Sequence, residues 1–287
     1  MELAPNLCLV GYTYRHWPLR RLFEAAADYG YPWVEVRTCA DVDLGTPEGV
    51  TAALAQAGAL ANEHGVKLGA ISLGNLWVGA LGDLHRRNPL ALDAALLARV
   101  RAAGFRQVHL LLERVRPDGG HVLSADEATE EDFRACREAI DLLAEVLDPL
   151  DLRAAVEVRP GTISDTLEGL LWSVAPLEHR AVGVLLDFAN LVMTNPTVDL
   201  VDAVKALHSA IGYIHLKNLK IGPGGLDRAV PLGLGTIDYY RVLSAVAGTG
   251  YRGLVGVEYV GDGDLDYFVR EDAEYVRWLE GRLRRRR

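Results

Sequence analysis

The stretch Val182-Gly183-Val184-Leu185-Leu186 is an almost unbroken apolar run that ends at an acidic residue, Asp187. A strand of this composition has no polar face, so both of its faces need cover from other parts of the chain. Parallel sheets meet that need, because the helices that connect their strands pack on the faces of the sheet. The run therefore predicts one strand of an α/β fold with a parallel sheet.

On both sides of this run, short apolar segments alternate with longer amphipathic segments along the whole chain. Strands are expected at eight places, residues 7–11, 33–37, 67–72, 107–112, 153–158, 183–187, 213–217 and 253–258. Helical patterns follow them at residues 18–29, 46–64, 89–103, 130–147, 164–173, 198–210, 237–249 and 269–283. Eight such units in 287 residues predict a (β/α)8 TIM barrel, which takes about 250 residues. An open doubly wound sheet is the alternative, but no Gly-x-Gly-x-x-Gly turn follows the first predicted strand.

The chain is interpreted as a single barrel domain over residues 1–287, because no linker or low-complexity segment divides it. Its longest irregular stretches are residues 72–88, 113–129 and 218–236. All three follow a predicted strand, so they belong to the C-terminal mouth of the barrel, where active sites are built. The arginine-rich segment 282–287 is expected to fray at the end of the last helix.

Charge and hydropathy disfavour several classes of protein. The 39 Asp and Glu residues outnumber the 30 Lys and Arg residues, and the net charge of −9 disfavours a nucleic-acid partner. No apolar run approaches the roughly 20 residues that cross a bilayer. The N-terminus also lacks the basic and apolar regions of a secretory signal. We therefore expect a cytoplasmic protein with neither a nucleic-acid partner nor a membrane partner.

Four successive predicted strands end in a charged or imidazole side chain: Glu157, Asp187, His215 and Glu258. Such a group after several apolar residues costs free energy unless it is paired or binds a metal. The carboxyl ends of barrel strands meet at one mouth, so these four side chains should converge there. Three carboxylates and one imidazole form a hard, oxygen-rich set that suits Mn²⁺, Mg²⁺ or Co²⁺. For any one of these residues alone, a helix cap or an ion pair is the alternative.

The segments around these residues resemble the xylose-isomerase-like TIM barrel superfamily, the sugar phosphate isomerases and epimerases that also include endonuclease IV. The resemblance covers nearly the whole chain, from residues 22–35 to the end of the eighth predicted strand. Its most specific part is Pro231-Leu-Gly-Leu-Gly-Thr-Ile-Asp238, which leads to Gly250-Tyr-Arg-Gly253 and Glu258.

Similarity to the ketose 3-epimerases of this superfamily implies that Glu157, Asp187, His215 and Glu258 ligate Mn²⁺, with Mg²⁺, Co²⁺ and Zn²⁺ as alternatives. It also implies that Glu157 and Glu258 act as acid/base groups. A metal that polarises a ketone stabilises the enediolate formed when the neighbouring carbon loses a proton. One glutamate on each face of a sugar or sugar-like polyol could then epimerise or isomerise it.

The sequence departs from the family pattern after three strands. Arg159 and Asn190 stand where members commonly have histidines, and Asn218 stands where they have an aspartate. The histidine missing at Asn190 argues against the trinuclear zinc centre of endonuclease IV. We expect Asn190 and Arg159 to face the substrate, and Arg159 could hold a phosphate or carboxylate through paired hydrogen bonds. The alternative for Arg159 is an ion pair with Glu35 or Glu113.

Four further residues are candidates for substrate binding. Lys217 follows the seventh predicted strand and could donate to a substrate hydroxyl, whereas a salt bridge to a ligand carboxylate is its alternative. His16 and Trp17 follow the first strand and offer either a pocket wall or a surface loop. Glu113 ends the fourth strand on the mouth side. His109 alternates within that strand and is expected to be a core histidine.

Two other functions stay open on this evidence. The same site could serve a dehydratase or lyase that acts on a keto-inositol or a 3-keto-glycoside, where the enolate expels a leaving group. The changed residues at the strand ends could instead mark a non-catalytic barrel that acts as a binding partner. A homodimer or homotetramer is compatible with each of these functions.

Overall fold

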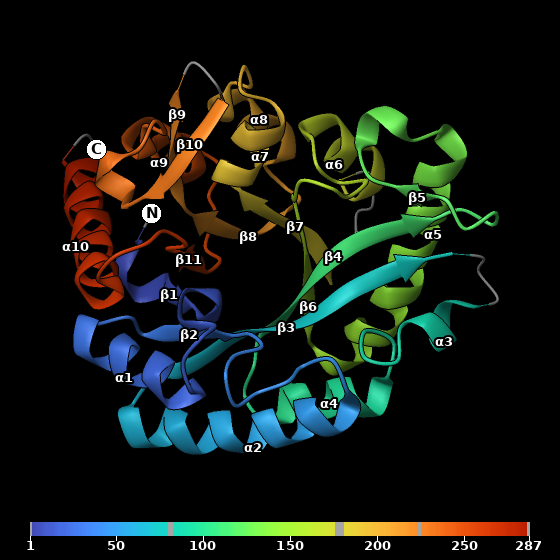
Figure 1. Ribbon diagram of the computed structural model, residues 1–287, viewed down its shortest axis with the longest axis horizontal. Coiled ribbons are helices and arrows are strands. Elements are labelled where there is room, and N and C mark those ends of the chain that lie inside the picture. The colour runs from blue at the N-terminus through green and yellow to red at the C-terminus, as the bar shows by residue number, and fades with distance from the viewer. Residues whose placement is uncertain (1, 80–82, 176–180, 223–224, 286–287) are drawn as a thin grey trace.

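The computed structural model describes residues 2–79, 83–175, 181–222 and 225–285. Within them, eight parallel strands form a barrel that helices surround (Figure 1). The strands are β1 (Leu7–Val10), β2 (Trp33–Val36), β3 (Lys67–Val78), β4 (Gln107–Val115), β6 (Arg153–Glu157), β7 (Val182–Asp187), β8 (Ile211–Leu216) and β11 (Val255–Val257). They pair in the order β3-β2-β1-β11-β8-β7-β6-β4, and pairing of β3 with β4 closes the ring. The (β/α)8 TIM barrel and its eight strands are confirmed.

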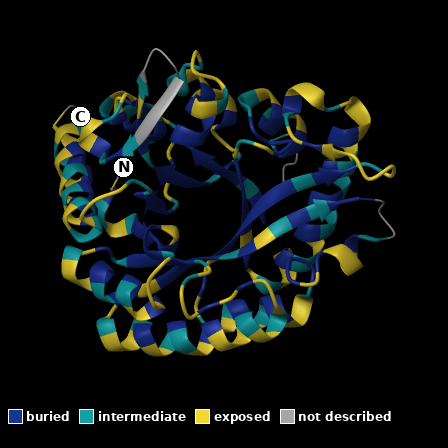
Figure 2. Ribbon diagram, in the orientation of Figure 1, coloured by how far each residue is buried: buried dark blue, intermediate teal, exposed yellow. Residues whose placement is uncertain are grey.

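The helices lie outside the strands and turn their buried sides to the barrel (Figure 2). They are α1 (Leu19–Tyr29), α2 (Pro47–His64), α3 (Leu84–Arg87), α4 (Ala94–Ala102), α5 (Glu130–Leu147), α6 (Leu167–Ser173), α7 (Phe188–Thr194), α8 (Leu200–Leu207), α9 (Tyr239–Gly248) and α10 (Leu265–Arg284). Local signals set their ends: Thr46 accepts a hydrogen bond from the Gly49 amide before α2, and Gly65 ends that helix with a φ of 66°. Among the described residues, no helix is both long and apolar enough to span a bilayer.

The irregular stretches expected at the mouth contain more sheet than their sequences indicate. Strand β3 runs to Val78 and pairs with β4 beyond a register shift that includes Gly74, whose φ of 76° breaks the strand pattern. The short strand β5 (His121–Val122) pairs antiparallel with the end of β4. The stretch after β8 forms a hairpin of β9 (Asn218–Gly222) and β10 (Gly225–Val230).

Several helices differ from their expected positions, and α3 was not expected. Helix α7 was not expected; it begins directly after β7, where the Asp187 carboxylate accepts a hydrogen bond from the Asn190 amide over 2.9 Å. Helix α10 starts at Leu265 because Asp264 caps it, and it continues to Arg284, into the segment expected to fray. Residues 286–287 of that segment lie outside the described residues.

An apolar layer fills the barrel interior at the N-terminal part of the strands. Its members are Cys8, Trp33, Ala70, Ala155, Leu185, Tyr213 and Leu254. None is more than 5% exposed, so this layer excludes water from below the site. The next inward positions along several of the same strands carry polar side chains.

Candidate active site

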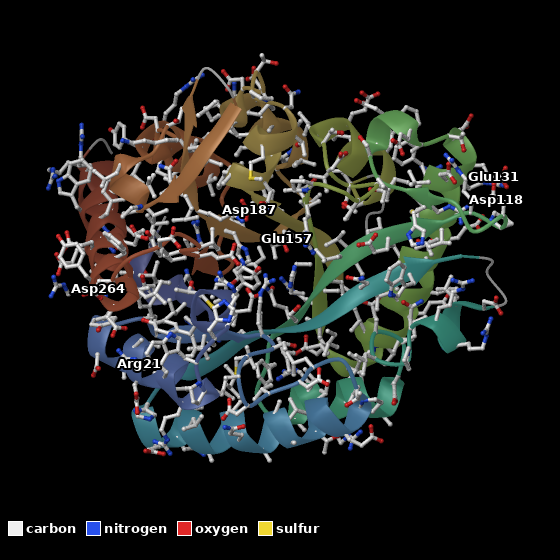
Figure 3. The ribbon with its side chains drawn as sticks, viewed as in Figure 1. Arg21, Asp118, Glu131, Glu157, Asp187 and Asp264 are labelled. Atoms are coloured by element: carbon white, nitrogen blue, oxygen red, sulfur yellow. The ribbon has the colours of Figure 1, made fainter. Side chains whose placement is uncertain are left out.

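Four buried polar side chains stand two residues beyond members of the apolar layer, in the order Trp33 to Glu35, Ala155 to Glu157, Leu185 to Asp187 and Tyr213 to His215. Side chains two residues apart on a strand point to the same face, so the polar set forms the next layer toward the mouth. Figure 3 shows Glu157 and Asp187 at the centre of the barrel, whereas Asp118 and Glu131 lie at its outer edge.

Glu157, Asp187 and His215 form a cluster whose candidate ligand atoms all lie within 4.8 Å of one another. His215 Nδ1 lies 4.0 Å from Asp187 Oδ2. Nδ1 is buried and has no hydrogen-bond partner among the described residues, whereas the Lys217 ammonium lies 2.9 Å from Asp187 Oδ2. Nδ1 is unprotonated in the neutral ring when Nε2 carries the proton, which it donates to Glu35 Oε2 over 2.9 Å. Buried polar atoms without partners are rare in folded proteins. A divalent cation bound by Nδ1 and the two nearby carboxylates would satisfy this nitrogen, so these residues fit a metal.

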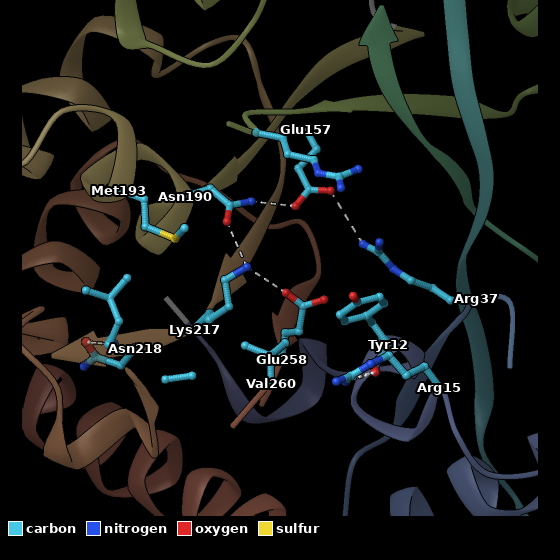
Figure 4. Close-up of a pocket in the computed structure, with 13 residues that line it drawn as sticks. Tyr12, Arg15, Arg37, Glu157, Asn190, Met193, Lys217, Asn218, Glu258 and Val260 are labelled. Carbon is cyan, nitrogen blue, oxygen red and sulfur yellow. Dashed lines mark hydrogen bonds and ion pairs between the residues drawn. The ribbon is translucent and has the colours of Figure 1, made fainter. Parts of the chain in front are cut away.

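Glu258 reaches the cluster through Lys217. The Lys217 ammonium lies 2.9 Å from Asp187 Oδ2 and 3.0 Å from Glu258 Oε2, and it donates to Asn190 Oδ1 over 2.9 Å. Figure 4 shows this lysine between Asn190 and Glu258. Lys217 therefore makes the salt bridge to candidate ligand carboxylates that was its alternative role. Its positive charge lies near Asp187, Glu258 and Glu157.

Three residues outside the predicted ligand and substrate-binding sets contact the cluster, and two of them, Glu35 and Arg37, end the second predicted strand on the mouth side. Arg37 Nε donates to Glu35 Oε1 over 2.5 Å, and Arg37 Nη2 lies 3.8 Å from Glu157 Oε2. His109, expected to be a core histidine, is buried but lies with Nε2 2.7 Å from Glu157 Oε2. Glu35 and His109 each stand two residues beyond an inward-facing position, so a period-two count combined with strand register is the signal that finds them.

The charges in this cluster set the protonation of its carboxyl groups. Burial alone would raise the pKa of Glu157, but His109 and Arg37 hold it well below its ordinary value. Lys217 and Arg37 likewise outweigh burial and lower the pKa of Glu258. The pKa of Asp187 is raised, because burial and the neighbouring Glu157 and Glu258 outweigh Lys217. Both glutamates are thus ionised at neutral pH. Their negative charges make ionisation of Asp187 less favourable.

A cavity of about 340 Å³ opens at the mouth, and Glu157 and Glu258 line it together with Arg159, Asn190 and Lys217. Three of the residues expected to bind substrate therefore share one cavity with both predicted acid/base groups. The other three, His16, Trp17 and Glu113, are not among the residues that line it.

The loop after β1 contributes to this cavity through neighbours of the expected residues. His16 and Trp17 are exposed, whereas Tyr12 and Arg15 line the cavity (Figure 4). Arg159 forms no ion pair with Glu35 or Glu113 among the described residues. Burial raises the pKa of Glu113, and the charge of Arg159 opposes that shift.

Comparison with known proteins adds a family to this geometry. A family model described as xylose isomerase-like TIM barrel matches residues 23–280. The chain belongs to the xylose isomerase-like TIM barrel family. The resemblance found in the sequence is thereby confirmed, although no curated protein sequence matches the chain.

Several solved structures with the same fold can be superimposed on nearly the whole length of this xylose isomerase-like chain. An L-ribulose 3-epimerase shares 18% identity over 98% of this chain and 96% of its own, with a TM-score of 0.73. An IOLI protein with a bound zinc atom shares 17% identity over 97% of each chain, with a TM-score of 0.74. The probable 3-DHS dehydratase AsbF from Bacillus anthracis shares 16% identity over 95% of this chain and 98% of its own, with a TM-score of 0.72. At such identities the likeness shows a common fold, on which different reactions occur.

Proposed function

We propose that the protein is a divalent-metal-dependent isomerase or epimerase that acts on a sugar or sugar-like polyol. One observation carries this proposal: Glu157 and Glu258 line one cavity, beside a buried cluster of Glu157, Asp187 and His215 in which His215 Nδ1 has no hydrogen-bond partner among the described residues. The structural likeness to an L-ribulose 3-epimerase and to a zinc-containing IOLI protein supports it.

Glu157, Asp187 and His215 would hold the cation, and Glu258 is the fourth candidate ligand. Mn²⁺ is the first choice for this oxygen-rich set, with Mg²⁺, Co²⁺ and Zn²⁺ as alternatives. When bound, the cation supplies Lewis-acid polarisation of a substrate carbonyl.

The residues of this chain then carry the protons. One ionised glutamate removes the proton from the carbon next to the carbonyl, which leaves an enediolate. The other glutamate takes a proton from solvent and delivers it to the opposite face, which gives the epimer. The first glutamate releases its proton to solvent, so both carboxylates are restored. Lys217 stays protonated, because Asp187 and Glu258 raise its pKa despite its burial, and its contacts with Asp187, Glu258 and Asn190 balance the carboxylate charge beside the substrate.

Elimination is the second candidate reaction, on a keto-inositol or a 3-keto-glycoside. The protonated Lys217 ammonium, 3.0 Å from Glu258 Oε2, favours it, because this group could protonate a departing hydroxyl after Glu258 or Glu157 has removed a proton. The structural likeness to a probable 3-DHS dehydratase supports the same reading. Elimination forms an enone that absorbs ultraviolet light, whereas epimerisation and isomerisation do not.

Solvent-deuterium exchange tests the shared first step. The metal-loaded protein is incubated in D₂O with a panel of ketoses and keto-polyols, and deuterium at the carbon next to the carbonyl is measured by NMR. Glu258→Gln keeps the shape of the side chain but not its basicity, so we expect exchange to fall by about 10²–10⁴-fold with an unchanged circular dichroism spectrum. Glu63→Gln, at an exposed glutamate that pairs with Arg20, is the matched control. Full exchange in Glu258→Gln would refute the assignment, and a protein that binds no divalent metal would favour the non-catalytic barrel.

Three further expectations stay predictions from the sequence. They are a cytoplasmic location, a homodimer or homotetramer, and the lack of a nucleic-acid partner.

A further inference from the structure

Cationic side chains outnumber anionic ones in the cavity at the mouth. Its lining contains four cations and two anions, namely Arg15, Arg37, Arg159 and Lys217 against Glu157 and Glu258. The lining thus has a net charge of +2, although the chain as a whole has −9. The buried Glu35 and Asp187 behind the lining bring the local sum to zero, and a divalent cation would restore +2. With that cation bound, the cavity would carry net positive charge, in contrast to the acidic chain as a whole.

Two of the four cations are already paired with carboxylates. Arg37 donates to Glu35, and Lys217 contacts both Asp187 and Glu258. These two groups stabilise the acidic cluster itself, so their charges are largely neutralised within the site.

The other two cations, Arg15 and Arg159, pair with no carboxylate in the part of the chain that the structure describes. Arg15 donates to the Tyr12 carbonyl over 3.2 Å, and its guanidinium carbon lies 4.7 Å from the centroid of the Tyr12 ring. This contact holds the side chain at the cavity while leaving other N–H groups free. The exposed Arg159 side chain donates no hydrogen bond to a described residue.

A neutral polyol would leave this pair of guanidinium groups without a charged partner. Carboxylates and phosphates match the planar guanidinium fork through two parallel hydrogen bonds, which are stronger than bonds between neutral groups. The volume of about 340 Å³ lies at the small end of the range for ligand pockets, which suits a single monosaccharide-sized molecule.

From these contacts we infer that the substrate is an anion of monosaccharide size, a sugar acid or a sugar phosphate. Its reacting carbons face Glu157 and Glu258, and Arg15 and Arg159 hold its carboxylate or phosphate group. The inference rests on the proposed function for the position of the reacting carbons, and it names the class of substrate for that site.

Three probes with the same six-carbon polyol chain test it: D-gluconate, D-glucitol 6-phosphate and neutral D-glucitol. Their binding to the Mn²⁺-loaded protein is measured by isothermal titration calorimetry, with metal content checked by mass spectrometry on the same samples. We expect at least one anionic probe to bind tenfold or more tightly than D-glucitol, and the preferred anion distinguishes carboxylate from phosphate. Arg15→Gln and Arg159→Gln should each lower the affinity for that anion about tenfold or more and leave the affinity for D-glucitol unchanged. Arg20→Gln, at an exposed arginine that pairs with Glu63, should change neither.

Equal affinity for D-glucitol and both anions would overturn the inference, as would no binding of either anion at millimolar concentration. Equal losses for all three probes in the arginine variants would overturn it too, since they would indicate a structural role. If the anion preference fails while metal binding and deuterium exchange persist, the proposed function stands without this substrate class. Anion binding by a protein that takes up no metal would instead contradict the proposed function.

Discussion

Two adjacent layers of the barrel interior stand on the same strands and differ in almost every physical property. In the lower layer, Ala155, Leu185 and Tyr213 are buried among apolar neighbours, and burial of that surface stabilises the fold. Two residues further along, Glu157, Asp187 and His215 carry charge or unpartnered polar atoms, and their desolvation is offset by contacts with polar neighbours such as Lys217 and His109. The comparison teaches that, along one strand, residues that stabilise the fold and residues of the candidate site are only two positions apart.

The largest effect is expected when the upper layer loses Asp187. Asp187→Asn removes the charge but keeps an oxygen that can accept the Asn190 amide, so metal should be lost and turnover should fall by about 10³-fold or more. Asp187→Ala loses the helix cap as well and should unfold more easily by about 1 kcal/mol. Mass spectrometry of bound metal and urea unfolding of both variants check this pair. Stoichiometric metal in Asp187→Asn would remove this residue from the ligand set.

The lower layer should respond in the opposite way. Leu185 is fully buried and stands two residues before Asp187, so Leu185→Ala should lower the free energy of unfolding by about 2–5 kcal/mol. Metal content and turnover per folded molecule should stay close to those of the unchanged protein. Denaturant unfolding and an active-fraction assay measure the two quantities separately. A variant that kept its stability but lost its turnover would contradict the division between the layers.

Much of this division could be predicted, because apolar runs identify the strands and the first polar residue after each run identifies the mouth. The supporting residues could not be predicted that way. His109 and Glu35 lie within strands, and only the register of the closed barrel shows that they meet Glu157 and His215. The family resemblance implied a ligand role for Asp187, which stays a prediction, but it did not indicate that Asp187 caps α7.

Loops were harder to predict than strands. A 3₁₀ turn at Gly11–Tyr14 follows β1, and it is Tyr12 and Arg15 that line the cavity where His16 and Trp17 were expected. Composition does not determine which residues of this loop, separated by one to five positions, face the cavity. The hairpin of β9 and β10 escaped notice for a related reason, since its glycine-rich segment has no clear strand alternation.

A smaller effect should follow from changing the partner that orients His215. Glu35→Gln removes the carboxylate that accepts the Nε2 proton, so metal affinity should fall about 10–100-fold while the four candidate ligands remain. Competition with a chromophoric chelator measures this affinity without any assay of turnover. Unchanged affinity, with folding intact, would show that Glu35 serves Arg37 rather than the histidine.

The smallest effect concerns a buried carboxyl group that has no cation beside it in the part of the chain that the structure describes. Asp272 accepts the Leu232 amide over 2.7 Å, and burial raises its pKa to about 7. Because the folded-state pKa lies above the unfolded value, the folded protein holds this proton more tightly and loses stability as the pH rises through about 7. Between pH 6 and pH 8 the loss should be about 1.4 kcal/mol. Urea unfolding at several pH values checks this, and Asp272→Asn should flatten the profile; an equal decline in the variant would assign it to other groups.

Asn190 links the two sides of the site without being able to titrate. Its side-chain Nδ2 donates to Glu157 Oε1 over 2.9 Å, and its Oδ1 accepts from Lys217 Nζ over 2.9 Å. Asn190 thus connects a carboxylate to an ammonium group. An imidazole at this position could take up a proton on one ring nitrogen and release it from the other, whereas a carboxamide cannot. Asn190 therefore fixes the geometry of Glu157 and Lys217 but cannot itself pass a proton from one to the other.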